Sequence, residues 1–139
     1  MTPDHRIALL LDRLMRRFGA GIHARARDAD PDRIGPLGGM ILTTLADIEP
    51  TPLRDLVVLM SRDKSQMTRA IQMLESKGFV LRDPSPSDRR VTIVQLTDQG
   101  RAKVEVIRRT MAEVADEILT PLSDEARAQL TELLEELSY

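Results

Sequence analysis

The stretch from Arg62 to Leu96 constrains the fold most, because a helix with one polar face leads directly into a hairpin with a basic tip. At 100° per residue, the apolar and polar side chains of this helix separate onto opposite sides. The apolar side holds Met67, Ala70, Ile71 and Leu74, and the polar side holds Ser65, Thr68, Arg69 and Gln72. Asp63 can cap the start of the helix, and Gly78 stands where a C-terminal cap is expected. One face therefore suits a core and the other suits a partner.

The hairpin that follows this helix has a long tip. Strand candidates occupy residues 79–83 and 91–94, and a Pro/Ser-rich run over residues 84–87 precedes Asp88, Arg89 and Arg90. Two adjacent arginines at an exposed tip are easily placed against phosphates or inside a narrow minor groove. Asp88 can hold one of them in a fork-shaped ion pair. Helix and hairpin together indicate the DNA-contacting part of a winged helix.

The polar face of the helix carries side-chain types that read base edges in a major groove. Arginine can bond guanine bidentately, glutamine can bond adenine, and serine or threonine can bond either a base or a phosphate. The candidate DNA contacts are Lys64, Ser65, Gln66, Thr68, Arg69 and Gln72 on the helix, and Asp88, Arg89 and Arg90 on the hairpin tip. The helix alone leaves a merely solvated polar face as an open alternative, and the double-arginine tip favours DNA.

An ordered set of short motifs in the chain resembles the MarR family of bacterial transcriptional regulators. The motifs are Met67-Thr68-Arg69, the run from Leu74 to Arg82, Asp88-Arg89-Arg90, and the run from Leu96 to Gly100. The resemblance implies a homodimeric winged helix-turn-helix protein whose recognition helix enters the major groove and whose wing reaches the minor groove. The turn Met60-Ser61-Arg62-Asp63 departs from the pattern, since relatives often carry glycine and an apolar residue there.

Length and composition agree with one helix-rich domain. The 139 residues include 42% hydrophobic but only 2% aromatic residues, which predicts an aliphatic core. Cysteine is absent, which excludes disulfides and thiolate chemistry. The net charge is only −2, but residues 61–90 carry seven basic against four acidic side chains, whereas residues 112–139 carry one against eight. A local basic face on a mildly acidic chain suits a DNA-binding protein.

The rest of the chain predicts further helices. A long amphipathic helix rich in arginine is expected from His5 to about Arg27, followed by a Pro/Gly-rich linker over residues 28–39. A second helix is expected from about Leu37 to Asp47, and a third over residues 53–60, directly after a proline. The third helix and the polar-faced helix would form the helix-turn-helix.

The C-terminal part of the chain repeats apolar residues at helical spacing. Thr97 can cap a helix whose stripe, Val104 to Ile118, suits either a coiled coil or burial against the first helix. Pro121 ends that helix, and Ser123 can cap the last one. The first and last helices are apolar on one side and oppositely charged on the other, so they predict a dimerisation layer, with a private monomer core as the alternative. The predicted dimerisation residues are Leu10, Leu14, Leu130, Leu133, Leu134 and Leu137.

Other function classes find little support in the sequence. With two histidines and no catalytic or phosphate-binding motif, neither an enzyme, a cofactor nor a metal site is expected. No apolar run suits a membrane span, so a cytoplasmic protein without membrane contact is expected. The resemblance also implies a pocket for a small aromatic or lipophilic effector between the dimer layer and the DNA-reading region. By architecture, that pocket would be lined by Arg16, Ala20, His23, Met40 and Thr44.

The sequence thus predicts a mainly α fold with a small β wing, a winged helix-turn-helix flanked by dimerisation helices. One domain would span residues 1–139, with the DNA-binding region over about 37–100 and dimerisation helices over about 5–27 and 101–139. The predicted function is a sequence-specific regulator of transcription, a ligand-responsive repressor that binds double-stranded DNA as a homodimer at an inverted repeat. The alternative is a winged helix used only for protein–protein contact.

Overall fold

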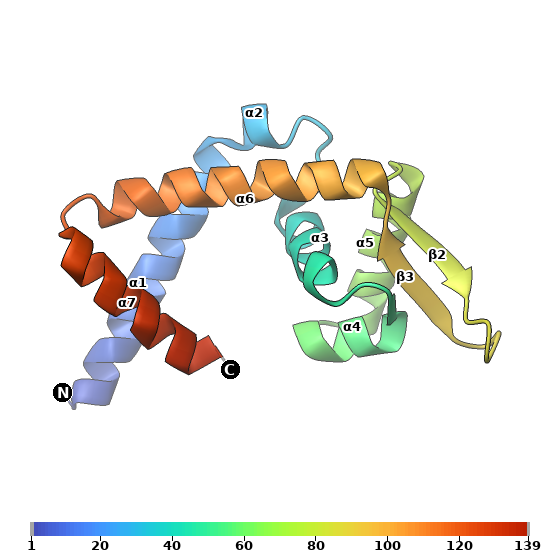
Figure 1. Cartoon of the computed structure of the whole chain (residues 1–139), viewed down its shortest axis with the longest axis horizontal. Helices are drawn as coiled ribbons and strands as arrows, with labels where there is room; N and C mark the ends of the chain where they lie inside the picture. Colours follow the sequence, from blue (N-terminus) through green and yellow to red (C-terminus); the bar gives the residue numbers. More distant parts are fainter. Residues whose placement is uncertain (1, 139) are drawn as a thin grey trace. The chain divides into compact units, whose positions relative to one another are not determined.

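A computed structural model describes residues 2–138 of the chain, and Figure 1 shows the order of its elements. The helices are α1 (Pro3–Ala24), α2 (Ala26–Ala29), α3 (Gly35–Ile48), α4 (Leu53–Met60), α5 (Lys64–Ser76), α6 (Asp98–Leu119) and α7 (Asp124–Ser138). The strands are β1 (Thr51–Pro52), β2 (Val80–Pro84) and β3 (Thr92–Leu96). The predicted fold class, mainly α with a small β wing, is confirmed.

The chain forms two compact units. The central unit runs from Ala26 to Arg109, and the terminal unit combines the residues up to Arg25 with those from Thr110 onward. The long helix α6 contributes its first part to the central unit and its last part to the terminal unit. The apolar stripe on α6 therefore serves both units: Val104 belongs to the core of the central unit, while Val114 is buried in the terminal unit.

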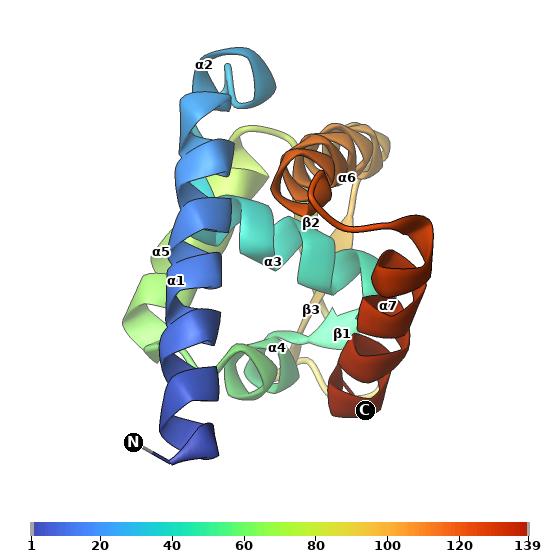
Figure 2. The ribbon, with the colours of Figure 1, turned by 90° about the vertical axis from the view of Figure 1, so that its left-hand side faces the viewer.

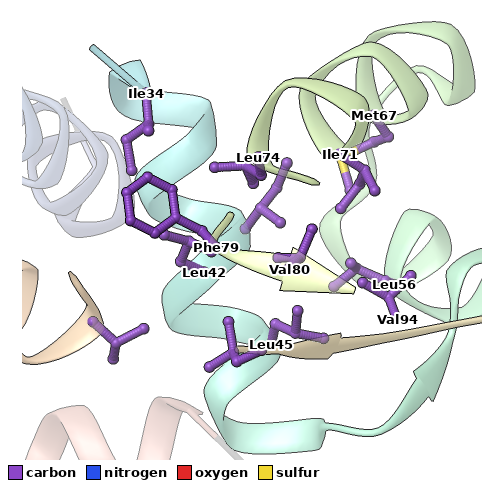
Figure 3. Packing of buried hydrophobic residues seen from close by; sticks show 13 residues of the cluster. Ile34, Leu42, Leu45, Leu56, Met67, Ile71, Leu74, Phe79, Val80 and Val94 are labelled. Carbon is purple, nitrogen blue, oxygen red and sulfur yellow. The ribbon is translucent and has the colours of Figure 1, made fainter. Parts of the chain in front are cut away.

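The core of the central unit is aliphatic, as the composition predicts. Figure 3 shows side chains of this core, which come from α3, α4, α5, the first part of α6, and the strands β2 and β3. The members with at most 1% exposure are Ile41, Leu42, Leu45, Leu56, Met67, Ile71, Leu74, Val80 and Val94. Each such fully buried side chain contributes about 1.5–3 kcal/mol relative to an exposed one. The core thereby fixes α5 against α3, α4 and the sheet.

The sheet has three antiparallel strands in the order β1-β3-β2. β2 and β3 pair from Val80 opposite Leu96 to Pro84 opposite Thr92, which is the hairpin expected from the sequence, shifted by one or two residues. β1 is not predicted by the sequence, because two residues are too few to show an alternating pattern. Its Pro52 lies on the sheet edge, where a missing backbone N–H is tolerated.

The boundaries of the first helices correct the sequence-based ones. The first helix covers Pro3–Ala24 instead of residues 5–27, because the Thr2 hydroxyl caps its start by accepting from the His5 N–H. The second long helix begins at Gly35, inside the predicted linker, since Pro36 fits its first turn. The carboxylate of Asp30 accepts hydrogen bonds from the N–H groups just before and at this helix start.

The loop between α2 and α3 is anchored by a buried lysine. Lys103 of α6 is only 6% exposed, and its ammonium donates to the Ala29 carbonyl at 3.1 Å and to the Asp32 carboxylate at 3.2 Å. Lys77, the C-cap of α5, donates to the Asp32 carbonyl. Because both lysines hold the same loop, the end of α5 and the start of α6 are tied to the entry into α3.

The terminal unit contrasts with this core. Among the described residues, neither α1 nor α7 contains a single buried side chain. The last part of α6 packs closely on α1, since a Cβ placed on Gly21 would lie 2.6 Å from a Val114 methyl. Arg25, the C-cap of α1, also pairs with Glu113 and Glu117 of α6. α1 and α7 are thus held by α6 while their apolar faces remain open to solvent.

Candidate nucleic-acid interface

The helix α5 begins and ends at the residues that the sequence indicates. The Asp63 carboxylate accepts from the Gln66 N–H at 3.0 Å, which caps the helix start. At the other end Gly78 has φ 84°, and the Phe79 N–H donates to the Leu74 carbonyl at 2.9 Å. A residue in the left-handed region with this bond is the usual helix stop. The α5 face that points away from the core is therefore set by local capping as well as by packing.

The predicted contact residues of α5 lie on its solvent side. Met67, Ile71 and Leu74 are buried, as predicted. Lys64, Ser65, Gln66, Arg69 and Gln72 are exposed, and within residues 2–138 their side chains have no hydrogen bond or ion pair. Thr68 differs, because it is half-buried and its hydroxyl donates to the Lys64 carbonyl at 2.8 Å. The face therefore offers unengaged donors and acceptors to a partner.

The turn between α4 and α5 shows how residues 60–63 fold although they depart from the motif of the MarR family. Ser61 has φ 50° and ψ 39°, a left-handed conformation that glycine adopts without strain. The next side chain, Arg62, is exposed, and its guanidinium approaches the Met40 sulfur at 3.8 Å. The turn keeps its geometry with serine in place of glycine, and it presents a cation beside the start of α5.

The wing tip lies between β2 and β3, at the far end of the hairpin from α6 (Figure 1). Arg90 donates to both oxygens of the Asp88 carboxylate, at 3.1 and 3.2 Å, which confirms the predicted fork. Its backbone N–H also donates to Asp88, and these bonds lower the pKa of that carboxyl group. The side chain of Arg90 is still 91% exposed, and Arg89 is exposed beside it. The tip therefore presents two cations, one of them held in a fixed direction.

One ion pair that the sequence did not reveal connects α5 to the wing. Arg82 of β2 donates to the Glu75 carboxylate of α5 at 2.9 Å, and both side chains are mostly buried. This hydrogen bond lowers the pKa of Glu75 and raises that of Arg82. The available signal was opposite charges on the last turn of α5 and on the following strand. A charge pair across a turn becomes specific only when the strand direction is known.

The base of the wing is closed by the motif from Leu96 to Gly100. Thr97 donates through its hydroxyl to the Gly78 carbonyl at 2.6 Å and through its N–H to the Phe79 carbonyl at 3.0 Å. Its hydroxyl also accepts from the Gly100 N–H and caps α6, as predicted. A Cβ on Gly100 would lie 2.0 Å from the Phe79 carbonyl oxygen, so no larger residue fits. This motif fixes where α6 leaves the wing.

The predicted dimerisation residues all lie in the terminal unit. Leu130 is half-buried, and the remaining five are exposed, with Leu137 reaching 80%. Figure 2 shows the two helices that carry them, α1 and α7, running in opposite chain directions. A 22-residue and a 15-residue amphipathic helix without a buried side chain expose an unusually long apolar surface. A private monomer core, the alternative considered from sequence, does not cover these faces.

The predicted effector-pocket residues come from two helices in different units. Arg16, Ala20 and His23 are exposed on α1, where Arg16 pairs with Asp12. Met40 is exposed on α3, and Thr44 is half-buried there. The pocket stays a prediction from the family resemblance.

The described residues give little support for metal or membrane binding. Residues 2–138 contain no group of three or more His, Asp or Glu side chains placed to hold a metal ion. None of the described helices has both the length and the hydropathy to cross a membrane.

Comparisons with known proteins identify the family. The model of the MarR family matches residues 39–92. The transcriptional regulator PecS of Dickeya dadantii is 31% identical over 93% of this chain and 74% of its own length. The uncharacterised regulator YdgJ of Bacillus subtilis is 36% identical over 68% of this chain, and the match spans only 57% of YdgJ.

A solved structure extends the similarity to the whole fold. A mutant of E. coli MarR, crystallised in complex with operator DNA, matches with a TM-score of 0.71 over the full length of both chains. The sequences are 23% identical, so this likeness concerns the fold alone. Fold, motifs and relatives agree: the chain belongs to the MarR family of winged helix-turn-helix transcriptional regulators, which are not enzymes.

Proposed function

We propose that this protein is a homodimeric repressor that binds an inverted-repeat operator and releases it when a small aromatic or lipophilic molecule binds. The observation that carries the DNA-binding part is the unengaged polar face of α5 beside a wing tip with two exposed arginines. The half-buried Glu75–Arg82 pair joins the end of α5 to the first strand of the wing. In the MarR complex of the same fold, the bound partner is operator DNA.

The residues take different roles in this proposal. Arg69, Gln72 and Gln66 contact base edges, because their planar or forked groups match the major-groove patterns of guanine and adenine. Lys64, Ser65 and Thr68 contact phosphates or bases near the start of α5. Arg90 enters the minor groove of the flanking sequence, with Asp88 fixing its direction and Arg89 on the adjacent phosphates.

Pairing of two copies follows from the requirement for affinity. One α5 contacts only a few base pairs, and two linked copies gain affinity through effective concentration. The exposed apolar faces of α1 and α7 supply the surface for such pairing. We therefore assign residues around 37–100 to DNA binding and the terminal helices to dimerisation.

The ligand-responsive part of the proposal rests on the family resemblance and on Met40. This methionine is exposed on α3 and contacts Arg62 in the turn that leads into α5. A lipophilic molecule that packs on Met40 would disturb Arg62 and with it the start of the recognition helix.

Selection of bound duplexes from a random DNA pool tests the proposal. The expected product is an imperfect inverted repeat whose half-sites lie about 34–36 Å apart, one helical turn on the same side of the duplex. Binding should weaken steeply with salt, because phosphate contacts release counterions. A pool without enrichment, or salt-independent binding, would favour the alternative of a protein–protein module.

A further inference from the structure

A row of arginines runs along one edge of the apolar face of α1. On a helical projection Arg6, Arg13 and Arg17 fall within about 40° of one another. All three are exposed and, in the described part of the chain, have no acidic partner. This distinguishes them from Arg16 and Arg25, which pair with Asp12 and with two glutamates of α6. The arginine row therefore carries uncompensated charge beside an uncovered apolar surface.

A matching row of glutamates runs along the apolar edge of α7. Glu125, Glu132 and Glu136 also fall within about 40° of one another. They are exposed and have no basic partner among residues 2–138. The spacing along the chain, seven and then four residues, is the same in the glutamate row as in the arginine row. The two rows are thus opposite in charge, and each ends in a pair of charges four residues apart, Arg13 and Arg17 on α1 and Glu132 and Glu136 on α7.

The two rows do not meet within one copy. No hydrogen bond or ion pair of the described residues joins α1 to α7. We propose that the arginine row of each copy pairs with the glutamate row of a second copy, and that this pairing selects which chains dimerise. The inference rests on the proposed homodimer. It adds charged residues that select the partner, and these are different from the leucines that the sequence predicts for dimerisation.

The projection also sets the direction in which the two helices pack. Both rows lie on the same rotational side of their apolar faces, as seen along each chain. When two helices pack through their apolar faces, flanks of the same rotational sense meet only if the helices are antiparallel. In the antiparallel arrangement the four-residue pair at the end of one row faces that of the other, so that Arg13 of one copy lies opposite Glu136 of the second copy and Arg17 opposite its Glu132. Opposite charges at these positions favour dimers between copies of this chain. A different chain that carried like charges at the facing positions would be repelled.

Two charge-reversed chains test the pairing. One carries Arg13→Glu with Arg17→Glu, and the other carries Glu132→Arg with Glu136→Arg. Each alone would place like charges opposite one another at both contacts of the dimer. We expect the dissociation constant of its homodimer to rise about tenfold or more at low salt, and less at high salt. An equimolar mixture should form heterodimers with affinity near that of the wild type, measured by native mass spectrometry with one chain tagged.

Controls separate charge pairing from general effects. Asp124→Arg with Glu135→Arg makes the same charge change on α7 outside the row and should leave dimerisation unchanged. A chain with all four reversals should recover homodimerisation. The inference would be overturned, with the proposed dimer still in place, if both charge-reversed variants homodimerised as tightly as the wild type. It would also be overturned if both variants dimerised weakly alone and formed no heterodimer in the mixture. A monomeric wild-type chain would overturn the proposed dimer itself.

Discussion

The central and terminal units of this chain differ in how much of their apolar surface is buried within one copy. The central unit contains a buried aliphatic core among α3, α4, α5 and the sheet, so its DNA-facing surface is defined within a single copy. The terminal helices α1 and α7 bury none, although they are as strongly amphipathic. A helix stabilised mainly by packing needs a surface to pack on. The proposed homodimer accounts for this difference, because the central unit has its core within one copy and the terminal helices would pack on a second copy.

The largest effect is expected when pairing is prevented without a change in the central unit. Leu130→Asp with Leu134→Asp puts charge into the apolar contact, which is costly without a partner. We expect monomers in sedimentation and a loss of operator affinity of about 10²- to 10⁴-fold, although Arg69 and Arg90 are unchanged.

The matched control for this variant is Ala128→Asp with Thr131→Asp, which adds the same charges to exposed positions of α7 outside the leucine edge. It should remain dimeric. If the Leu130/Leu134 variant were monomeric but kept wild-type operator affinity, the paired mechanism would be contradicted. If the variant stayed dimeric, the dimer interface would lie elsewhere on the chain.

Truncations in the central core and on α7 should destabilise different things. Leu45→Ala removes a side chain with 0% exposure from the central core and should lower the free energy of unfolding by about 2–5 kcal/mol. Leu137→Ala removes one that is 80% exposed in a single copy and should act mainly on dimer dissociation. Chemical denaturation at several protein concentrations separates the two, because only the second effect depends on concentration. If Leu137→Ala also lowered the free energy of unfolding of the monomer by several kcal/mol, Leu137 would pack within a single copy and not on a second one.

The central unit was largely predictable from sequence because its signals are local. Period, capping and turn residues placed α4 and α5 almost to the residue, and the Asp88–Arg90 fork followed from side-chain chemistry. The strand β1 and the Glu75–Arg82 pair were missed, because both depend on which segments meet in three dimensions. The terminal helices were predictable as helices. Their lack of buried side chains in one copy was not, since periodicity shows that a face is apolar but not what covers it.

Within the central unit, Arg69 tests whether α5 reads bases. Arg69→Ala should weaken binding to the selected operator by about 1–3 kcal/mol and binding to unrelated DNA much less, because a base contact is sequence-specific. Titration of both duplexes at the same salt concentration provides the comparison. Equal losses on both would reduce Arg69 to a phosphate contact.

The turn at Ser61 offers a smaller effect of the opposite sign. Ser61→Gly relieves a left-handed backbone conformation at φ 50° and should raise the free energy of unfolding by about 1 kcal/mol. Thermal unfolding measures this gain. A destabilised variant would mean that the serine side chain contributes more than its backbone strain removes.

The smallest expected effect belongs to the wing. Arg90→Ala should lower affinity by under about 1 kcal/mol on average, and more on operators with A·T-rich flanks, whose narrow minor groove attracts arginine. Operators that differ only in their flanks make the measurement, with Arg89→Ala as the neighbouring control. A loss that is the same on every flank would leave Arg90 as a plain phosphate contact.

Sedimentation equilibrium of the unmodified protein, alone and with operator duplexes, distinguishes a paired DNA-binding protein from one that binds as a single chain. We expect a particle of twice the 15.6 kDa chain mass without DNA, and two chains on a duplex that carries both half-sites. A duplex with a single half-site should be bound much more weakly. A 15.6 kDa monomer that binds the full operator tightly as one chain would contradict the division into a finished DNA-reading unit and a pairing unit.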